Sequence, residues 1–471
     1  MMRRAIFFLQ LMLFRDIVCN DDMRIRKREL RATQEKAAKT SIVTYKKAEM
    51  TAKQIEDETR RIGQLCNCTV EHLQNVGAFV LSYRSANHLN ASNLDLDHSK
   101  EVGGEDGIVT VFEEAATSQM TPNDPSFNSQ WALANLANAA DINAQSGWEE
   151  YLSDSNGGSE NGPKVIVAVI DTGVDYNHPD LKNRMWVNPR EISGNGLDDD
   201  NNGIIDDVYG ADFTSGNAGD PMDRHGHGSH CAGIIAAEED NSLGIAGVAS
   251  FSQGKVKIMA VKGLNDGGSG SYSGLLKALN YAIGQGAKIS SNSWGSTSSM
   301  SDSIEELWDN VLRNNVDHLF VTAAGNSNKF VNNNYKPMAC GLNEPNLLCV
   351  ASSTKTDEKS SFSNYGKDFV HVFAPGSAIF STFLNNGYKN LSGTSMACPH
   401  VSGLAALIMT MSSNLTGKEV KELIEANVQN KTAYKDLVRS GGLIDVAKTI
   451  KSLKSKGTGI KFNNNCFKFT H

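Results

Sequence analysis

The sequence predicts an α/β fold in which a parallel sheet is covered by helices on both faces. Apolar runs of strand length, such as VIVAVI (165–170) and HLFVTAA (318–324), are continuous rather than alternating, as expected for strands buried on both sides. Helical segments such as SGLLKALNYAIG (273–284) separate these runs, and that order is typical of a parallel sheet. Ligands of such sheets gather at the carboxyl ends of the strands.

The composition is that of an ordinary globular protein. The chain has 471 residues, of which 40% are hydrophobic and 21% charged, so two or three domains are expected. The net charge is −8 and the sequence pI about 5.8. Because there is no basic excess, neither nucleic acid nor an acidic membrane surface is an expected partner.

Residues 1–19 are expected to form a signal peptide. Two arginines precede the apolar run Ala5–Phe14, which is too short to span a bilayer, and Arg15 and Asp16 make the cleavage region untidy. The alternative is a disordered N-terminus with an apolar patch. No later run reaches ~18 apolar residues, so no transmembrane anchor is expected. The sequence therefore predicts a protein of the secretory pathway, secreted or in a secretory organelle.

Composition divides the rest of the chain into five parts. Residues 40–116 alternate strand-like stretches (SIVTYK, GAFVLSY, GIVTVFEEA) with the helix-like MTAKQIEDETRRIGQL, which predicts a small α+β unit. The parallel-sheet pattern begins near Gln130. The expected parts are a basic segment (20–39), the α+β unit (40–116), a polar linker (117–129), the main domain (130–455) and a C-terminal tail (456–471).

The eight cysteines match neither a dense disulfide scaffold nor a zinc ribbon. Cys66 and Cys68 have no second pair at metal-ligand spacing. Cys340 and Cys349 bracket a loop and are a candidate disulfide in an oxidising compartment. N-glycosylation sequons occur at Asn67, Asn90, Asn390, Asn414 and Asn430.

Polar residues follow several strand-like runs, where a parallel sheet carries its chemistry. Asp171 ends VIVAVID, and a carboxylate there can be a helix cap, a metal ligand or the orienting acid of a triad. DRHGHGSHCAG places His225, His227 and His230 in a Gly-rich turn before an apolar helix. Three close histidines raise a zinc alternative, although no HExxH glutamate accompanies them.

Two further stretches supply groups suited to acyl transfer. HLFVTAAGN ends on Asn326, whose amide can donate to a developing oxyanion, or can simply be a turn residue. GTSMACPHVSG (393–403) sets Ser395 at the start of an apolar helix, where it is either a nucleophile or part of an ordinary helix start.

Together these stretches resemble the subtilisin-like serine proteases, the subtilase family. The matching motifs AVIDTGVDYNHPDL, HGHGSHCAG, SNSWG, TAAGN and GTSMACPHVSG occur in order, and Asp, His, Ser is the chain order known for subtilisin. The resemblance implies a subtilisin-like catalytic domain with serine endopeptidase activity. Ser395 would be the nucleophile, His227 its base, Asp171 the orienting acid and Asn326 the oxyanion donor beside the Ser395 N–H.

The resemblance also assigns the cleft for polypeptide substrates. Ser293, Trp294 and Gly295 match the edge on which a substrate lies as an added strand. Ala324 and Gly325 match the opposite wall of the primary pocket. KFVNNNYKPMAC, near the base of the pocket, has no assigned match, so the primary specificity is left open.

An acidic stretch, GNGLDDDNNGIIDD, predicts calcium. Asp198, Asp200 and Asn202 alternate before Gly203 as in the first half of an EF-hand loop, although no glutamate closes the shell. The alternative is a solvated acidic turn. Protozoan and some bacterial subtilases have a similar insert. The candidate ligands are Asp198, Asp200, Asn202, Ile204 and either Asp207 or Asp206.

A second stretch, EEDNSLGIAG, resembles the calcium loop that follows the histidine helix in the family. The resemblance implies side-chain oxygens from Asp180 and Asn241 and carbonyl oxygens from Glu239, Leu243 and Ile245. Ca²⁺ is therefore the expected cofactor, binding and stabilising the folded state.

The unit 40–116 resembles the family's inhibitory propeptide, which implies a monomeric zymogen that cuts itself between Glu113 and Thr121. Two alternatives stay open. A cysteine protease would use Cys231 or Cys398, although both cysteines lie inside apolar helices rather than at the exposed turn. A catalytically silent member would bind peptides in the same groove.

Overall fold

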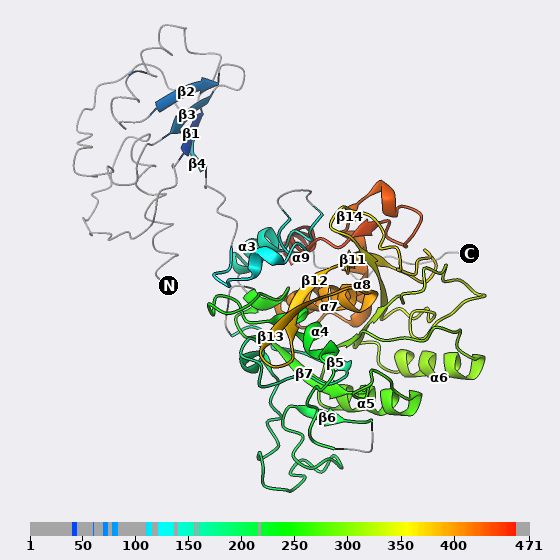
Figure 1. Cartoon of the computed structure of the whole chain (residues 1–471). Coiled ribbons are helices and arrows are strands. Elements are labelled where there is room, and N and C mark those ends of the chain that lie inside the picture. The colour runs from blue at the N-terminus through cyan, green and yellow to red at the C-terminus, as the bar shows by residue number, and fades with distance from the viewer. Residues whose placement is uncertain are drawn as a thin grey trace, which may run out of the picture. The chain divides into compact units, whose positions relative to one another are not determined.

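The computed structural model describes residues 121–135, 140–154, 157, 159, 161–214 and 218–457, together with Arg60 and four strands of the N-terminal part. The expected signal peptide and basic segment lie outside the described residues, as do residues 115–120 of the expected self-cleavage region and the tail from residue 458 onward. The chain divides into two compact units, residues 1–118 and 119–471. Figure 1 shows both units.

The first unit contains a four-stranded antiparallel sheet in the order β2-β3-β1-β4. Strand β1 is central, with Ile42 opposite Val80 of β3 and Phe112 of β4. Alternating sequence stretches predicted strands at the places of β1, β3 and β4, but not at that of β2. The bounds are Thr40–Thr44 for β1, Thr69–Leu73 for β2, Ala78–Ser82 for β3 and Thr110–Glu114 for β4.

The second unit is built on a nine-stranded sheet in the order β14-β15-β11-β10-β9-β8-β5-β7-β6. Its pairings are parallel except for β14 with β15. This confirms the predicted parallel sheet. The strands are β5 Val165–Asp171, β6 Gly210–Asp212, β7 Val256–Lys262, β8 Ile289–Asn292, β9 Leu319–Ala323, β10 Leu347–Ser353, β11 Val372–Pro375, β14 Gln429–Asn430 and β15 Gly442–Leu443.

Helices cover both faces of this sheet (Figure 1). Successive β5 residues alternate between two cores, with Val167 and Val169 in one and Ala168 and Ile170 in the other. Burial on both faces explains why the strands read as continuous apolar runs. The first core includes α3 (Ala144–Leu152), α4 (His227–Ala236), α7 (Thr394–Met411), α8 (Gly417–Ala426) and α9 (Val446–Gly457); the second includes α5 (Tyr272–Gly284) and α6 (Asp302–Arg313).

Helix α7 runs through the middle of the unit. Among the described residues it is the one helix long and apolar enough to cross a membrane, and nearly all of it is buried inside the domain. Such burial is what a core helix of a globular domain requires. Short 3₁₀ helices occupy Phe127–Ser129, Lys182–Arg184, Ser250–Ser252 and Thr432–Tyr434.

A separate hairpin of β12 (Ile379–Phe383) and β13 (Gly387–Leu391) leads directly into α7. It is bonded to α4, because the hydroxyls of Ser381 and Thr382 donate to the carbonyls of His230 (2.8 Å) and Ser229 (2.7 Å). The hairpin therefore fixes the beginning of α7 relative to the beginning of α4.

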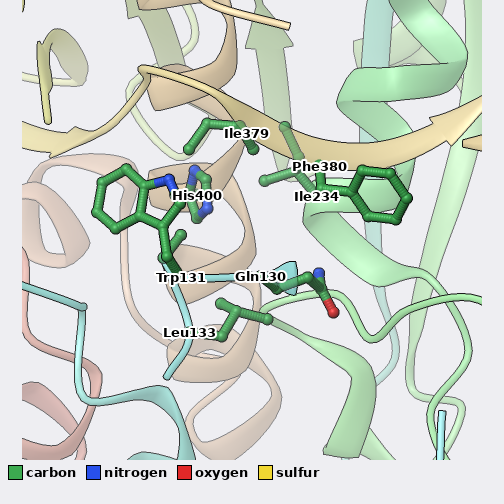
Figure 2. A pocket seen from close by; sticks show the side chains of 8 residues that line it. Gln130, Trp131, Leu133, Ile234, Ile379, Phe380 and His400 are labelled. Carbon is green, nitrogen blue, oxygen red and sulfur yellow. The ribbon is translucent and has the colours of Figure 1, made fainter. Parts of the chain in front are cut away.

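Figure 2 shows a small cavity where Gln130–Leu133 meets the hairpin, α4 and α7. Its volume is about 10 Å³, which is room for about one water molecule. The His400 ring beside it bonds through Nδ1 to the Met396 carbonyl (2.8 Å). The cavity is too small to take a peptide side chain.

Candidate active site

Four predicted site residues lie where parallel strands end or helices begin. Asp171 is the last residue of β5, His227 the first of α4, Ser395 the second of α7, and Asn326 follows β9. Gly226, before α4, has φ 94°, and a Cβ there would lie 2.5 Å from the Phe383 ring. Only glycine meets both demands, so the turn that presents His227 depends on it.

Asp171 and His227 are joined by a hydrogen bond. His227 Nδ1 lies 2.7 Å from Asp171 Oδ1, which also accepts from the Thr172 N–H (2.7 Å). Asp171 is fully buried, and the His227 side chain is 22% exposed. Burial lowers the pKa of His227, but the charge and hydrogen bond of Asp171 and the charge of Asp223 outweigh it and raise the pKa above the usual value. Nε2 is left for proton transfer.

The Ser395 side chain is tied to the predicted substrate edge. Its hydroxyl donates to the Ser293 carbonyl (3.0 Å), and the Ser293 hydroxyl donates to the Ser395 carbonyl (2.8 Å). Within the described part of the chain no hydrogen bond joins Ser395 to His227. Such bonds are often long without substrate and tighten in the complex.

Asn326 and the Ser395 backbone border one small space. Asn326 Oδ1 accepts from both the N–H and the hydroxyl of Thr394 (2.9 Å each), which turns Nδ2 to the other side. A Cβ built on Gly393 would lie 3.3 Å from Asn326 Nδ2 and 3.5 Å from Ser395 N. Two donors thus converge on a position that glycine leaves open, which suits an oxyanion.

Asp223 is a site residue that the sequence analysis missed. Its carboxylate is buried and caps the beginning of α4, the helix that carries His227. A carboxylate near a helix start is a signal for such a cap. Its donors are the Thr172 hydroxyl (2.9 Å), the N–H groups of His225, Gly226 and Ser229 (2.9 Å each) and the Ser229 hydroxyl (2.7 Å).

The predicted substrate residues follow two adjacent strands, β8 and β9, which pair in parallel with Asn292 opposite Thr322. A Cβ on Gly295 would lie 2.3 Å from the Met338 carbonyl oxygen. Gly325 has φ 98°, and its Cβ would lie 2.5 Å from an amide nitrogen. Both walls therefore depend on glycine, as close approach of backbones requires.

Trp294 and Ala324 contribute to this region in a different way. Both side chains are buried. Trp294 packs against Trp308 and Phe320, with ring centroids 6.0 and 6.2 Å away. These two residues can therefore offer a substrate their backbone rather than their side chains.

The predicted calcium loop EEDNSLGIAG surrounds a buried carboxylate, that of Asp180. Asp180 Oδ1 accepts from Asn241 Nδ2 (2.7 Å), and Oδ2 accepts from Ile245 N (3.0 Å) and the Tyr388 hydroxyl (3.1 Å). Burial raises the pKa of Asp180 despite these bonds. Asn241 Oδ1 accepts from Leu243 N (2.7 Å). The predicted residues thus lie together in one loop.

Asp124 also lies against this loop, although its surroundings in the sequence, TPNDPSFN, predict only a polar linker. It accepts from the N–H groups of Asp240 (3.1 Å) and Asn241 (3.3 Å). Burial raises the pKa of Asp124 to about 6, and the charges of Asp180 and Asp240 raise it too. Carboxylates that disfavour each other's ionisation fit a divalent cation. The Glu239 carboxylate pairs with Arg184 instead, which leaves its carbonyl as the predicted ligand.

Part of the predicted acidic insert forms a second group, which includes the unpredicted Glu191. Oxygen atoms of Glu191, Asp198 and Asp200 all lie within 4.8 Å of one another. Glu191 Oε2 is buried and has no hydrogen-bond partner within the described residues, and burial raises the pKa of this carboxyl group. Asp200 also pairs with Arg190 (3.2 Å). An orphaned buried oxygen among carboxylates fits a cation.

The other predicted ligands of the insert make hydrogen bonds within the protein. Asp207 accepts from the Tyr281 hydroxyl (2.5 Å) and from Asn202 Nδ2 (2.9 Å). Asn202 Oδ1 accepts from Ile204 N (2.8 Å). Asp206 accepts from the N–H groups of a glycine turn, 2.8 and 3.0 Å away. Asn202 is also bonded to the Glu191 group, because its N–H donates to Asp198 Oδ1 (3.1 Å) and Asp200 Oδ1 (3.2 Å).

The cysteines and the other histidines bear on the two rival chemistries. Cys340 and Cys349 form a disulfide. Cys231 and Cys398 are buried, and burial raises the pKa of both thiols, to about 11 for Cys398, which does not suit a nucleophile. His230 Nε2 lies 3.0 and 2.9 Å from two hairpin carbonyls, so the hairpin engages this ring nitrogen, while Nδ1 is buried with no hydrogen-bond partner among the described residues.

The subtilase family model matches residues 162–443. The chain belongs to the subtilase family. This subtilase is 35% identical over 321 residues to subtilisin-like protease 1 of Plasmodium berghei, covering 63% of this chain and 51% of the relative. It is 34% identical to thermitase of Thermoactinomyces vulgaris, covering 70% of this chain and 99% of thermitase.

A solved protease structure from Pseudoalteromonas arctica superposes with a TM-score of 0.55 at 25% identity, covering 71% of this chain and 99% of that one. The resemblance noted from the motifs and the subtilisin-like fold are thereby confirmed. This subtilase spans about half the length of the Plasmodium relatives that it matches.

Proposed function

We propose that this subtilase is a serine endopeptidase that hydrolyses peptide bonds in polypeptide substrates. The observation that carries the proposal is the convergence of Asn326 Nδ2 and Ser395 N on the space beside Gly393, at the same end of the sheet as the hydrogen-bonded Asp171–His227 pair.

In the proposed reaction His227 Nε2 accepts the Ser395 proton as Oγ attacks the substrate carbonyl carbon. The carbonyl oxygen becomes an oxyanion, which the Asn326 amide and the Ser395 N–H stabilise. Asp171 holds the ring through Nδ1 and stabilises the imidazolium. His227 then gives the proton to the leaving amine, and water repeats the sequence to release the acyl group.

The substrate would lie as an extended strand beside Ser293 and Gly295. Main-chain hydrogen bonds supply affinity in such binding, and side-chain pockets supply the choice of sequence. The Ser293 carbonyl accepts a hydrogen bond from the Ser395 hydroxyl. A substrate that binds along this edge must break that bond.

We also propose that the first unit, with residues 40–116, is an inhibitory propeptide of a monomeric zymogen that cuts itself between Glu113 and Thr121. Its support is the separate compactness of residues 1–118 and their antiparallel sheet. The apolar run Ala5–Phe14 and the Cys340–Cys349 disulfide support a place in the secretory pathway.

Calcium is proposed at two places. Asp124, Asp180 and Asn241, with the carbonyls of the Glu239–Ile245 loop, would hold one ion, and Glu191, Asp198 and Asp200 would hold another. All are oxygen donors, as Ca²⁺ prefers. The ions would relieve repulsion between buried carboxylates and so stabilise the folded state.

Turnover of a fluorogenic peptide library tests the proposed activity. The expected result is hydrolysis by the wild-type chain, loss of it in Ser395→Ala, and retention of it in Cys398→Ala, which controls for a thiol nucleophile. Hydrolysis that survives in Ser395→Ala would refute the nucleophile. No hydrolysis by a correctly folded, processed wild type would favour the silent peptide-binding member.

A further inference from the structure

Lys262 is a buried cation at the catalytic end of the sheet. It is the last residue of β7 and stands opposite Asp171 in the parallel pairing of β5 with β7. Its side chain is 3% exposed. The ammonium Nζ donates to the Thr172 carbonyl (2.6 Å) and to Asp266 Oδ1 (2.7 Å). A buried ammonium group needs such partners, because they offset the free-energy cost of removing its charge from water.

Thr172 links the parts of the proposed triad. Its N–H donates to Asp171 Oδ1 (2.7 Å), the oxygen that also bonds His227. Its hydroxyl donates to Asp223 (2.9 Å) and accepts from Gly228 N (3.0 Å), next to His227 in α4. Its carbonyl accepts from the Lys262 ammonium. The N–H, the hydroxyl and the carbonyl of Thr172 therefore all make hydrogen bonds.

The orientation of Asp171 depends on this turn. Its Oδ2 atom is buried and has no hydrogen-bond partner among the described residues. The hydrogen bonds of its carboxylate are therefore made by Oδ1, to Thr172 and His227. A displaced Thr172 would let the carboxylate rotate away from the imidazole.

Asp266, the second partner of Lys262, is 53% exposed and lies in the Gly-rich loop 263–270. A Cβ on Gly268 of this loop would lie 3.5 Å from the ring of His225, whose centroid is 6.3 Å from that of His227. The loop therefore flanks the entrance to His227. Arg224 and His225 are the other charged or titratable groups near Asp266.

We propose that Lys262 is a positioning residue that sets the Asp171–Thr172 turn and the 263–270 loop in register with each other. One arm, to Thr172, keeps Asp171 aimed at His227. The other arm, to Asp266, holds the loop beside which substrate reaches the triad. The inference rests on the proposed endopeptidase function.

The two arms predict separable kinetic effects. Lys262→Met keeps the length of the side chain and removes both arms, so kcat should fall about 10- to 100-fold, as small displacements of catalytic groups do. Loss of a buried cation bonded to Thr172, the residue after Asp171, also favours protonated His227, so the acid limb of kcat/KM should move to higher pH. Asp266→Ala removes only the loop arm and should raise KM with kcat nearly kept.

The matched control is Lys255→Met, at the residue directly before the other end of β7. Lys255 is also buried, and its ammonium also donates to a carbonyl, that of Gly157 (2.9 Å). Lys255→Met should lose stability but keep the kinetic parameters and the pH profile. Lys262→Arg, which keeps a donor, should restore the acid limb. Each kcat is calculated per active site, and the active sites are counted by titration with a fluorophosphonate. A smaller folded fraction of a variant therefore does not lower its measured kcat.

The proposal would be overturned if Lys262→Met and Lys255→Met had the same kcat and the same acid limb of kcat/KM. If Lys262→Met does not fold, the exposed Asp266→Ala decides, and an unchanged KM would overturn the loop arm. Failure of the proposed function is distinguishable, because the wild-type chain itself would then titrate no active sites.

Discussion

Asp223→Asn tests the most densely bonded group of the proposed site. The substitution keeps the shape, but the amide has one acceptor oxygen where the carboxylate has two. Oδ1 accepts from Thr172, His225 and Gly226, and Oδ2 from the N–H and hydroxyl of Ser229. The amide NH₂ would therefore face a backbone N–H.

The cost follows from these bonds. A hydrogen bond to a charged acceptor contributes roughly 1.5 to 3 kcal/mol. One of the two Ser229 bonds can be replaced, because its hydroxyl can turn to accept from the amide. One lost bond and the weakening of the others give an expected loss of about 3 kcal/mol in the free energy of unfolding. Denaturant unfolding in a Ser395→Ala background, which prevents autolysis, measures it.

The same substitution should alter the rate profile. The charge of Asp223 helps to raise the pKa of His227, so its removal should move the acid limb of kcat/KM to lower pH. Asp220→Asn is the control, because Asp220 is exposed and three residues away. An Asp223→Asn chain that matches the control in stability, or an acid limb that stays in place, would refute the role given to Asp223.

Other perturbations should act as follows. Asn326→Leu should lower kcat by about 10² to 10³ with KM little changed; a normal kcat would place the oxyanion donor elsewhere. His318→Gln should flatten the dependence of stability on pH. The pKa of buried His318 is lowered to about 4, so its contribution is present above the unfolded pKa near 6.5 and is lost as pH falls, by about 2 kcal/mol at pH 5. An equal slope in wild type and variant would contradict this. Asp124→Asn should lower the melting temperature in calcium but not in excess chelator; an equal drop in both would remove Asp124 from the calcium site. Ser395→Ala should leave the precursor uncut, as seen by mass spectrometry of the purified chain; cleavage between Glu113 and Thr121 would exclude self-processing.

Much of the parallel sheet was predictable because strands that are buried on both faces consist of continuous apolar residues. The β5 and β9 runs are continuous and apolar, and the chemistry-bearing residues Asp171 and Asn326 follow directly after them. The turn before α4 is equally local, because the backbone and steric demands at Gly226 require glycine, which is visible in the sequence.

Residues missed by the sequence analysis owe their roles to contacts distant in sequence. Asp124 meets Asp240 and Asn241 across 116 and 117 positions, and nothing in TPNDPSFN distinguishes it from a polar linker. Glu191 joins the insert through the fold of its loop, not through the alternating spacing that suggested Asp198 and Asp200. Hydrogen-bond partners of this kind have no fixed sequence period, so spacing cannot find them.

The most direct test of the proposed active site is labelling by a fluorophosphonate, which reacts only with a serine activated by its base and oxyanion donors. The purified, processed chain should be labelled at Ser395, as located by peptide mass spectrometry. His227→Ala and Ser395→Ala should not be labelled. A folded wild-type chain that stays unlabelled while thermitase is labelled in parallel, or a label on another residue, would contradict the assignment of Ser395, His227 and Asp171 as a working triad.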